Sequence, residues 1–157
     1  MSEGVLPQTF SGPREATGSR VVHATAVSFH GCGILIEGPS GSGKSALALR
    51  LMAHGAGLIA DDRTRIGPDV VSGAVMLEAP EALPALIEAR GIGLLPVTRA
   101  APAPLRLVVE LGRPAPGRLP EPETRTFSGQ MVTLIRPGTD VHVAAAIIQW
   151  VKGLGEG

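Results

Sequence analysis

The alternation of apolar and polar positions predicts strands and a helix in the first part of the chain. Val21–Phe29 is apolar and β-branched, and after a turn at His30 the run Gly33–Glu37 completes a predicted hairpin. A glycine-rich loop then leads into Ser45–His54, where the apolar spacing predicts a buried helix. Gly57–Ala60 predicts a further short strand, which we expect beside the strand that precedes the loop. This order of elements indicates an α/β fold.

The second part of the chain has short apolar runs separated by loops. We expect extended segments at Val70–Leu77, Leu94–Val97, Leu105–Leu111 and Thr126–Arg136, the last broken at Ser128. A short helix is predicted over Pro80–Leu86, and an irregular, proline-rich loop over Gly112–Glu123. A final helix, capped by Asp140, has one apolar face made of Val141, Ala144, Ile147, Ile148 and Val151.

Composition narrows the class of protein. The 157 residues suffice for one domain, and 14 basic residues balance 14 acidic ones. This balance argues against a nucleic-acid binder and a polybasic membrane anchor, which both need clustered positive charge. A single cysteine excludes an internal disulfide, and no apolar run approaches the ~18 residues of a membrane span. With no secretory signal either, we expect a cytoplasmic protein, and we expect residues 1–19 to form a flexible N-terminal leader.

A phosphate-binding loop is the strongest motif. The pattern G-x-x-x-x-G-K-[ST] is matched by Gly38, Pro39, Ser40, Gly41, Ser42, Gly43, Lys44 and Ser45. Its glycines let successive backbone N–H groups face a phosphate at the positive end of the following helix. Lys44 suits the β- and γ-phosphates, and the Ser45 hydroxyl suits Mg²⁺. We therefore predict a P-loop nucleotide-binding domain that has a mixed sheet with flanking helices and that binds a nucleoside triphosphate with Mg²⁺.

An acidic pair, Asp61 and Asp62, follows the predicted strand Gly57–Ala60 directly. Adjacent carboxylates at a strand end suit the orientation of Mg²⁺, the acceptance of a proton from an attacking hydroxyl, or both. A GTPase is disfavoured, because the guanine motif N-K-x-D needs an asparagine and the chain contains none. ATPases and small kinases remain, and the acidic pair is the feature that separates them.

Three segments resemble the catalytic domain of HPr kinase/phosphorylase, a bacterial enzyme that phosphorylates a serine of the phosphocarrier protein HPr. His23 precedes Lys44 by twenty-one residues, like the histidine upstream of that family's phosphate loop. Leu58–Arg63 resembles the family segment L-V-A-D-D-R. Ile87–Val97 resembles the long signature L-E-I-R-G-L-G-I-I-N-V. The last match is the most specific of the three.

The resemblance extends over Val21–Trp150 and implies one P-loop kinase catalytic domain over residues 20–157. It implies an Mg-ATP-dependent serine kinase that acts on an HPr-like phosphocarrier protein and assembles as a homo-oligomer, the family's hexamer. Asp62 is then the general base. The remaining implied roles fall on His23, Lys44 and Arg118 for catalysis, and on Ser45, Asp61 and Glu88 for Mg²⁺.

Two departures from the family pattern lead us to expect weak or absent phosphorylase activity. Leu134–Thr139 resembles the dephosphorylation loop P-V-R-P-G-R, but Thr139 stands where that loop has its second arginine. Family members also carry an additional N-terminal domain, for which 157 residues leave no room. Two other functions stay open. One is a small-metabolite kinase of the shikimate-kinase kind, with Gly112–Arg125 as its lid, and the other is a regulatory nucleotide-binding module without transfer activity.

Overall fold

The structure is a computed structural model that describes residues 18–80 and 84–154. Their helices and strands are β1 (Arg20–Val22), β2 (Thr25–Phe29), β3 (Cys32–Glu37), α1 (Lys44–Ala53), β4 (Gly57–Ala60), β5 (Thr64–Pro68), β6 (Val75–Glu78), β7 (Leu86–Ala89), β8 (Gly93–Pro96), β9 (Ala103–Glu110), β10 (Glu123–Phe127), β11 (Gln130–Ile135) and α2 (Val143–Leu154). The predicted leader, residues 1–19, lies outside the described residues except for its last two positions.

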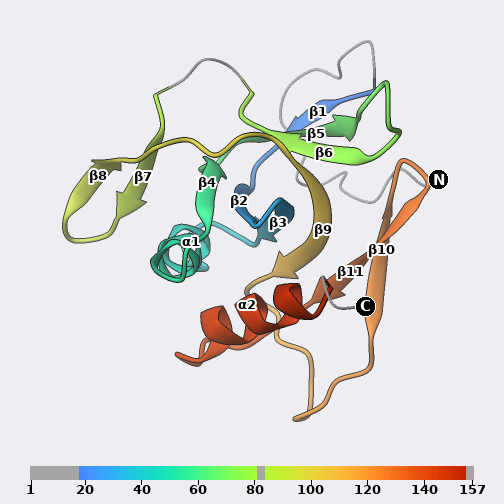
Figure 1. The fold of residues 1–157 in the computed structure, drawn as a ribbon. Coiled ribbons are helices and arrows are strands. Elements are labelled where there is room, and N and C mark those ends of the chain that lie inside the picture. The colour runs from blue at the N-terminus through green and yellow to red at the C-terminus, as the bar shows by residue number, and fades with distance from the viewer. Residues whose placement is uncertain (1–17, 81–83, 155–157) are drawn as a thin grey trace.

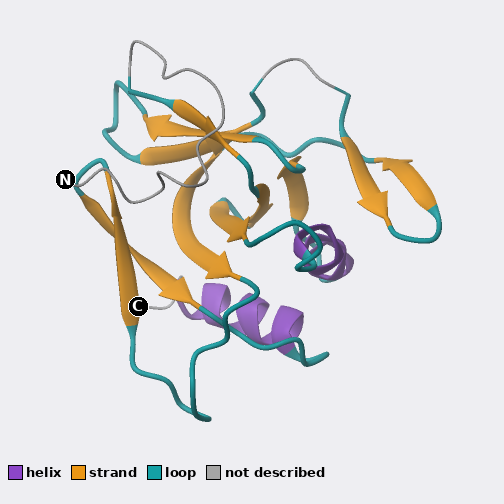
Figure 2. Ribbon diagram, turned by 180° about the vertical axis from the view of Figure 1, so that it is seen from behind, coloured by secondary structure: helices purple, strands orange, loops and turns teal. Residues whose placement is uncertain are grey.

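A curled, mixed sheet forms the body of the molecule (Figures 1 and 2). Its main strand order is β1-β5-β6-β9-β3-β2-β4, and β9 is central. β3 pairs in parallel with one side of β9. β6 and β11 pair with different parts of the other side of β9. β11 returns to β10 as a hairpin, and β7 pairs with β8 in a separate hairpin that projects from the body in Figure 1. The predicted α/β class with a mixed sheet is confirmed.

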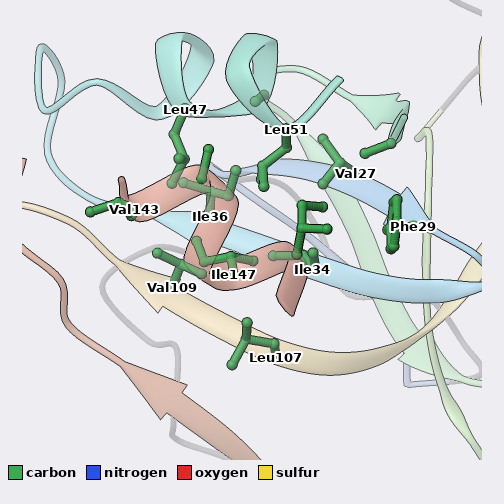
Figure 3. Packing of buried hydrophobic residues seen from close by; sticks show 14 of the residues in the cluster. Val27, Phe29, Ile34, Ile36, Leu47, Leu51, Leu107, Val109, Val143 and Ile147 are labelled. Atoms are coloured by element: carbon green, nitrogen blue, oxygen red, sulfur yellow. The ribbon is translucent and has the colours of Figure 1, made fainter. Parts of the chain in front are cut away.

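Both helices pack on one face of this sheet. Figure 3 shows Leu47 and Leu51 of α1 and Val143 and Ile147 of α2 gathered over Ile34, Ile36, Leu107 and Val109 of the central strands. Side chains alternate along a strand, so Leu35 and Val108 point to the opposite face, where the curled sheet encloses a second apolar cluster. Burial on both faces explains why β3 is a continuous apolar run.

Strand β2 separates the two strands that we expected to be neighbours. β4 pairs with β2, and β2 pairs with β3, in both cases antiparallel. The expectation that β4 lies beside the strand preceding the loop is therefore wrong. The sequence pattern hid this arrangement because a hairpin partner and a crossover neighbour are equally apolar.

Several predicted elements have different bounds. The predicted strand Val21–Phe29 is divided into two strands, β1 and β2. β1 pairs with β5, in a different part of the sheet from β2. Val70–Leu77 contains a turn, so its strand begins only at Val75. The predicted helix Pro80–Leu86 falls partly on residues outside the described ranges, and Leu86 itself begins the strand β7.

The last helix is shorter than predicted at its start. It begins at Val143, whose N–H donates to the Asp140 backbone carbonyl at 3.1 Å. Val141 lies before the helix and is 84% exposed, so it is not part of the apolar face. The other four predicted members of that face are buried. Neither of the two described helices is long and apolar enough to cross a membrane.

Candidate active site

The ends of three strands meet at one edge of the sheet. β3 and β4 run in the same direction because each is antiparallel to β2 between them. Their carboxyl ends therefore lie beside the amino end of β2, where Thr25 stands. The glycine-rich loop, residues 38–43, leaves β3 at this edge, and Asp61 and Asp62 follow β4 there. This topology brings together a loop and an acidic pair that are distant along the chain.

The glycine-rich loop ends in an open helix terminus. Gly43 precedes α1 with φ at 100°, a left-handed conformation that glycine adopts without strain, and no side chain caps the helix. The first N–H groups of a helix have no partner within it, so here they are available to an anion. Gly38 is closely packed, because a Cβ at this position would lie 3.0 Å from the Leu111 backbone carbonyl oxygen.

Lys44 is folded back over this loop. The residue is only 8% exposed, and its Nζ donates to the Gly38 carbonyl at 2.9 Å and to the Pro39 carbonyl at 3.3 Å. These acceptors are neutral, whereas a phosphate oxygen would offer the ammonium a charged and stronger acceptor. The side chain is thus held where a bound phosphate would need a cation.

Asp61 is fixed by three donors. Its Oδ1 accepts hydrogen bonds from Ser45 Oγ at 2.8 Å and from Thr25 Oγ1 at 2.9 Å. Its Oδ2 accepts one from the backbone N–H of Glu88 at 3.3 Å. The carboxylate therefore links α1, β2 and β7. Thr25, which the sequence analysis did not single out, also accepts the Asp62 N–H at 3.2 Å and so orients both acids.

Asp62 differs from its neighbour in its surroundings. Its φ is 73°, a left-handed value uncommon outside glycine, and this conformation turns its side chain to solvent, where it is 65% exposed. Its Oδ1 contacts Nε2 of His23, whose side chain is 48% exposed. The structure therefore unites the predicted residues His23 and Asp62 as a pair at the surface.

A pocket of about 550 Å³ opens at this edge of the sheet. Its polar lining comes from His23, Thr25, Ser40, Lys44, Ser45, Arg50, Asp62, Glu88 and Arg90. The β7–β8 hairpin forms one wall, through Glu88, Ala89, Arg90 and Ile92. Arg50 and Arg90 are cations that sequence reasoning missed as site residues. Arg90 carried a signal, because it lies within the signature segment Ile87–Val97.

The oxygen atoms present suit Mg²⁺ held jointly with a nucleotide. Ser45 Oγ and Asp61 Oδ1 are in contact, and the exposed Glu88 lines the same pocket. Among the described residues, no group of three or more His, Cys, Asp or Glu side chains is arranged to hold a metal alone. Mg²⁺ is commonly bound by one or two carboxylates together with substrate phosphates and water, so this donor set fits it.

Two predicted functional segments of the later chain do not line the pocket. Arg118 is exposed in the loop between β9 and β10 and is absent from the lining. Arg136 is engaged elsewhere: its Nη2 donates to Glu123 at 2.6 Å and its Nη1 to the Arg113 carbonyl at 3.1 Å. Thr139 is exposed and lies outside the lining as well. The predicted lid, Gly112–Arg125, contributes no lining residue either.

The fold and the site define the class as an α/β domain with a glycine-rich loop before a helix and an acidic pair on a nearby strand end. The family model "HPr Serine kinase C-terminal domain" matches residues 14–101, more than half of the chain. The chain belongs to this family, and the predicted family is confirmed. The match stops well before Trp150, to which we expected the resemblance to extend.

Individual relatives agree with this family. HPr kinase/phosphorylase from Stenotrophomonas maltophilia (strain K279a) is 39% identical over 104 residues, which cover 60% of this chain and 32% of that protein. The protein of the same name from Xanthomonas campestris pv. campestris (strain B100) is 41% identical over 103 residues, covering 59% of this chain and 31% of its own length. The match therefore spans about one third of the length of these curated relatives.

A solved structure shares the fold. The HPr(Ser) kinase/phosphatase from Coxiella burnetii matches with a TM-score of 0.73 and covers 85% of this chain and 89% of its own. Its sequence identity is 21%, so this likeness concerns the fold alone. It nevertheless extends beyond the sequence match, into the later strands.

Proposed function

We propose that this chain carries the catalytic site of an Mg-ATP-dependent serine kinase acting on an HPr-like phosphocarrier protein. The observation that supports it most directly is that Lys44, Ser45 and Asp62 line one open pocket, with Asp61 bonded to Ser45 directly behind the lining. Asp62 is exposed at the mouth, where a serine on the surface of another protein can reach it. We expect the reaction to take place in the cytoplasm.

The residues divide the chemistry between them. The N–H groups of the glycine-rich loop and Lys44 bind the phosphates, while Ser45 and Asp61, with Glu88 nearby, hold Mg²⁺. Mg²⁺, when bound, offsets charge on the β- and γ-phosphate oxygens. Asp62 accepts the proton of the serine hydroxyl while the serine oxygen forms a bond to the γ-phosphorus. The bond between that phosphorus and the bridging oxygen breaks, and ADP leaves with the electron pair.

His23 has a supporting role in this proposal. Its contact with Asp62 fixes one carboxylate oxygen and leaves the other to face the substrate. His23 therefore orients the base.

The alternatives receive less support. A small-metabolite kinase encloses its substrate under a lid, and the segment expected to serve as one does not line the pocket. A regulatory module without transfer activity has no use for an exposed carboxylate that a histidine orients beside the loop. The protein-kinase reaction accounts for both features.

The test is transfer of labelled phosphate. The chain is incubated with γ-labelled ATP, Mg²⁺ and an HPr-type protein, with a carrier whose acceptor serine is alanine as the matched control, and in parallel with a panel of small hydroxylated metabolites. We expect label on the unmodified carrier alone. Label on a metabolite would establish the small-metabolite reading, and tight ATP binding with no transfer would establish the regulatory one.

A further inference from the structure

The root of the glycine-rich loop contains a buried carboxylate. Glu37, the last residue of β3, is 3% exposed, and this burial raises the pKa of its carboxyl group while the Arg125 guanidinium opposes the rise. In the described part of the chain, Glu37 Oε2 and Ser42 Oγ are the buried side-chain atoms without a hydrogen-bond partner. Both belong to the segment 37–42. A negative charge directly before an anion-binding loop is unfavourable unless a cation neutralises it.

Arg125 of β10 supplies that cation. Its Nη1 donates to Glu37 Oε1 at 2.5 Å, and its Nη2 lies 3.5 Å from Glu110 Oε1. Glu37 and Glu110 are partners in the parallel pairing of β3 with β9, so their carboxylates lie side by side and Arg125 bridges them. The Arg125 side chain is only 16% exposed, which shields this contact from solvent.

Glu37 is also connected to Lys44 through the backbone of the glycine-rich loop. The Glu37 carbonyl accepts the Leu111 N–H at 2.8 Å, and the next two carbonyls, of Gly38 and Pro39, are the acceptors of Lys44 Nζ. Gly112 also packs on this loop, since a Cβ there would lie 3.1 Å from Pro39 Cδ. A displacement of Glu37 therefore reaches the lysine acceptors within two residues.

We propose that Arg125 is a positioning residue of the phosphate site, holding Glu37 so that the glycine-rich loop keeps its shape and offsetting the negative charge of the Glu37 and Glu110 carboxylates beside it. This inference rests on the proposed function for its ligand, Mg-ATP. Its second readout needs no ligand, because the loop is positioned before a nucleotide binds.

The experiment measures amide hydrogen exchange of residues 38–44 in the nucleotide-free chain and the affinity for Mg-ATP. The variants are Arg125→Met, which removes the cation, and Arg125→Lys, which keeps the charge but loses the bridging fork. Val75→Ala is the control for stability, because Val75 is buried in the opposite apolar cluster. Arg106→Met is the control for charge, because Arg106 is exposed on β9.

We expect Arg125→Met to speed exchange in the loop and to weaken Mg-ATP binding by about tenfold, and Arg125→Lys to do so by about threefold, within the range of such positioning contacts. Val75→Ala should lower the Tm and leave both quantities unchanged. If Arg125→Met and Val75→Ala lose the same amount of Tm and also show equal exchange in the loop, Arg125 contributes only to stability and the inference is wrong. If Arg125→Met does not fold, a folded Arg125→Lys with unchanged exchange and affinity overturns the inference. Absence of Mg-ATP binding in the unmodified chain would instead overturn the proposed function.

Discussion

The earlier and later halves of the chain contribute to the pocket in different ways. Every residue lining it lies between His23 and Ile92, inside the stretch 14–101 that the family model matches. The later half supplies the central strand β9 and the Arg125 side chain that contacts Glu37 beneath the loop. The residues that line the pocket thus come from one half, and much of their structural support comes from the other.

This difference explains where sequence similarity ends. Residues that face a phosphate or a metal must keep their chemical type, so a motif records them. A supporting strand needs only to be apolar and of the right length, so many sequences satisfy it. The fold likeness extends across most of the chain at 21% identity, as expected if the support is kept by shape rather than by residue type.

Among substitutions that test the contrast between the two halves of the chain, Asp62→Asn should have the largest effect on phosphoryl transfer. An amide keeps the shape but cannot accept the serine proton, so phosphorylation should fall by ~10²–10⁴-fold while Mg-ATP still binds. The measurement is single-turnover transfer beside a separate binding titration. Asp61→Asn is the matched comparison and should chiefly raise the Mg²⁺ concentration needed. Normal transfer by Asp62→Asn with a dead Asp61→Asn would mean that the two roles are reversed.

Lys44→Ala should follow in size. Removal of a charged donor to the transferring group should lower kcat/KM for ATP by about 10²–10³-fold. The control is Lys152→Ala, which removes the other lysine of the chain from an exposed position in α2. If Mg-ATP binding and transfer are both unchanged in Lys44→Ala, the loop is not a phosphate site.

The reverse reaction tests whether the later half takes any part in chemistry. Phosphorolysis places a phosphoserine and an inorganic phosphate together, and a lost charge-assisted contact costs about 1.5–3 kcal/mol. Arg136 is already engaged by Glu123, and Thr139 offers no charge. The family resemblance predicts weak pyrophosphate release from phosphorylated carrier with millimolar phosphate, raised about tenfold by Thr139→Arg. The position of Thr139 outside the pocket lining predicts instead that this substitution changes nothing. Release by the unmodified chain as fast as forward transfer would contradict the expectation of weak release.

The variant Arg118→Ala tests two opposite expectations for this residue, one from the family resemblance and one from the structure. The resemblance gives Arg118 a catalytic role, whereas its side chain is exposed and outside the pocket lining. For a surface residue we expect transfer within about twofold of the unmodified chain. A loss of two orders of magnitude would show that the loop between β9 and β10 reaches an active site, and the division between the two halves would then fail.

The smallest effect concerns pH and Glu37. Because burial raises the pKa of its carboxyl group above the ordinary value of 4.5, the folded chain keeps a proton that the unfolded chain loses. The associated stability is complete below 4.5 and is lost as the pH rises through the folded pKa. The Tm of the unmodified chain should therefore decline relative to that of Glu37→Gln as the pH rises above 4.5. A constant difference in Tm would show that the carboxyl group does not titrate differently on folding.

The sequence predicted which residues gather at the pocket better than it predicted the elements around them. The loop, the acidic pair and His23 were found because each has a fixed residue type at a fixed spacing. Thr25 escaped because a threonine at a strand start looks like any β-branched strand residue. The Arg125–Glu37 pair escaped for another reason. Its members are 88 residues apart, and they become neighbours only because β10 pairs with β11, β11 with β9, and β9 with β3.

The fold was predicted in class but not in connectivity. Apolar runs located β3, β9 and both helices, because burial imposes a clear pattern. β5 was missed, since its Gly67 and Pro68 are residues typical of turns. The insertion of β2 between β3 and β4 could not be read from the chain either, because strand order depends on which edges meet and each strand is equally apolar.

The central place of β9 has a consequence for where this domain can be cut. The family match ends at residue 101, and β9 begins at Ala103. A fragment that ended at the family boundary would leave the backbone N–H and C=O groups of β3 facing water, with Ile34 and Ile36 uncovered. An open apolar edge of that kind recruits other chains, so such a fragment should aggregate on expression. The segment that the family model matches is therefore shorter than the segment that must be expressed to obtain a folded domain.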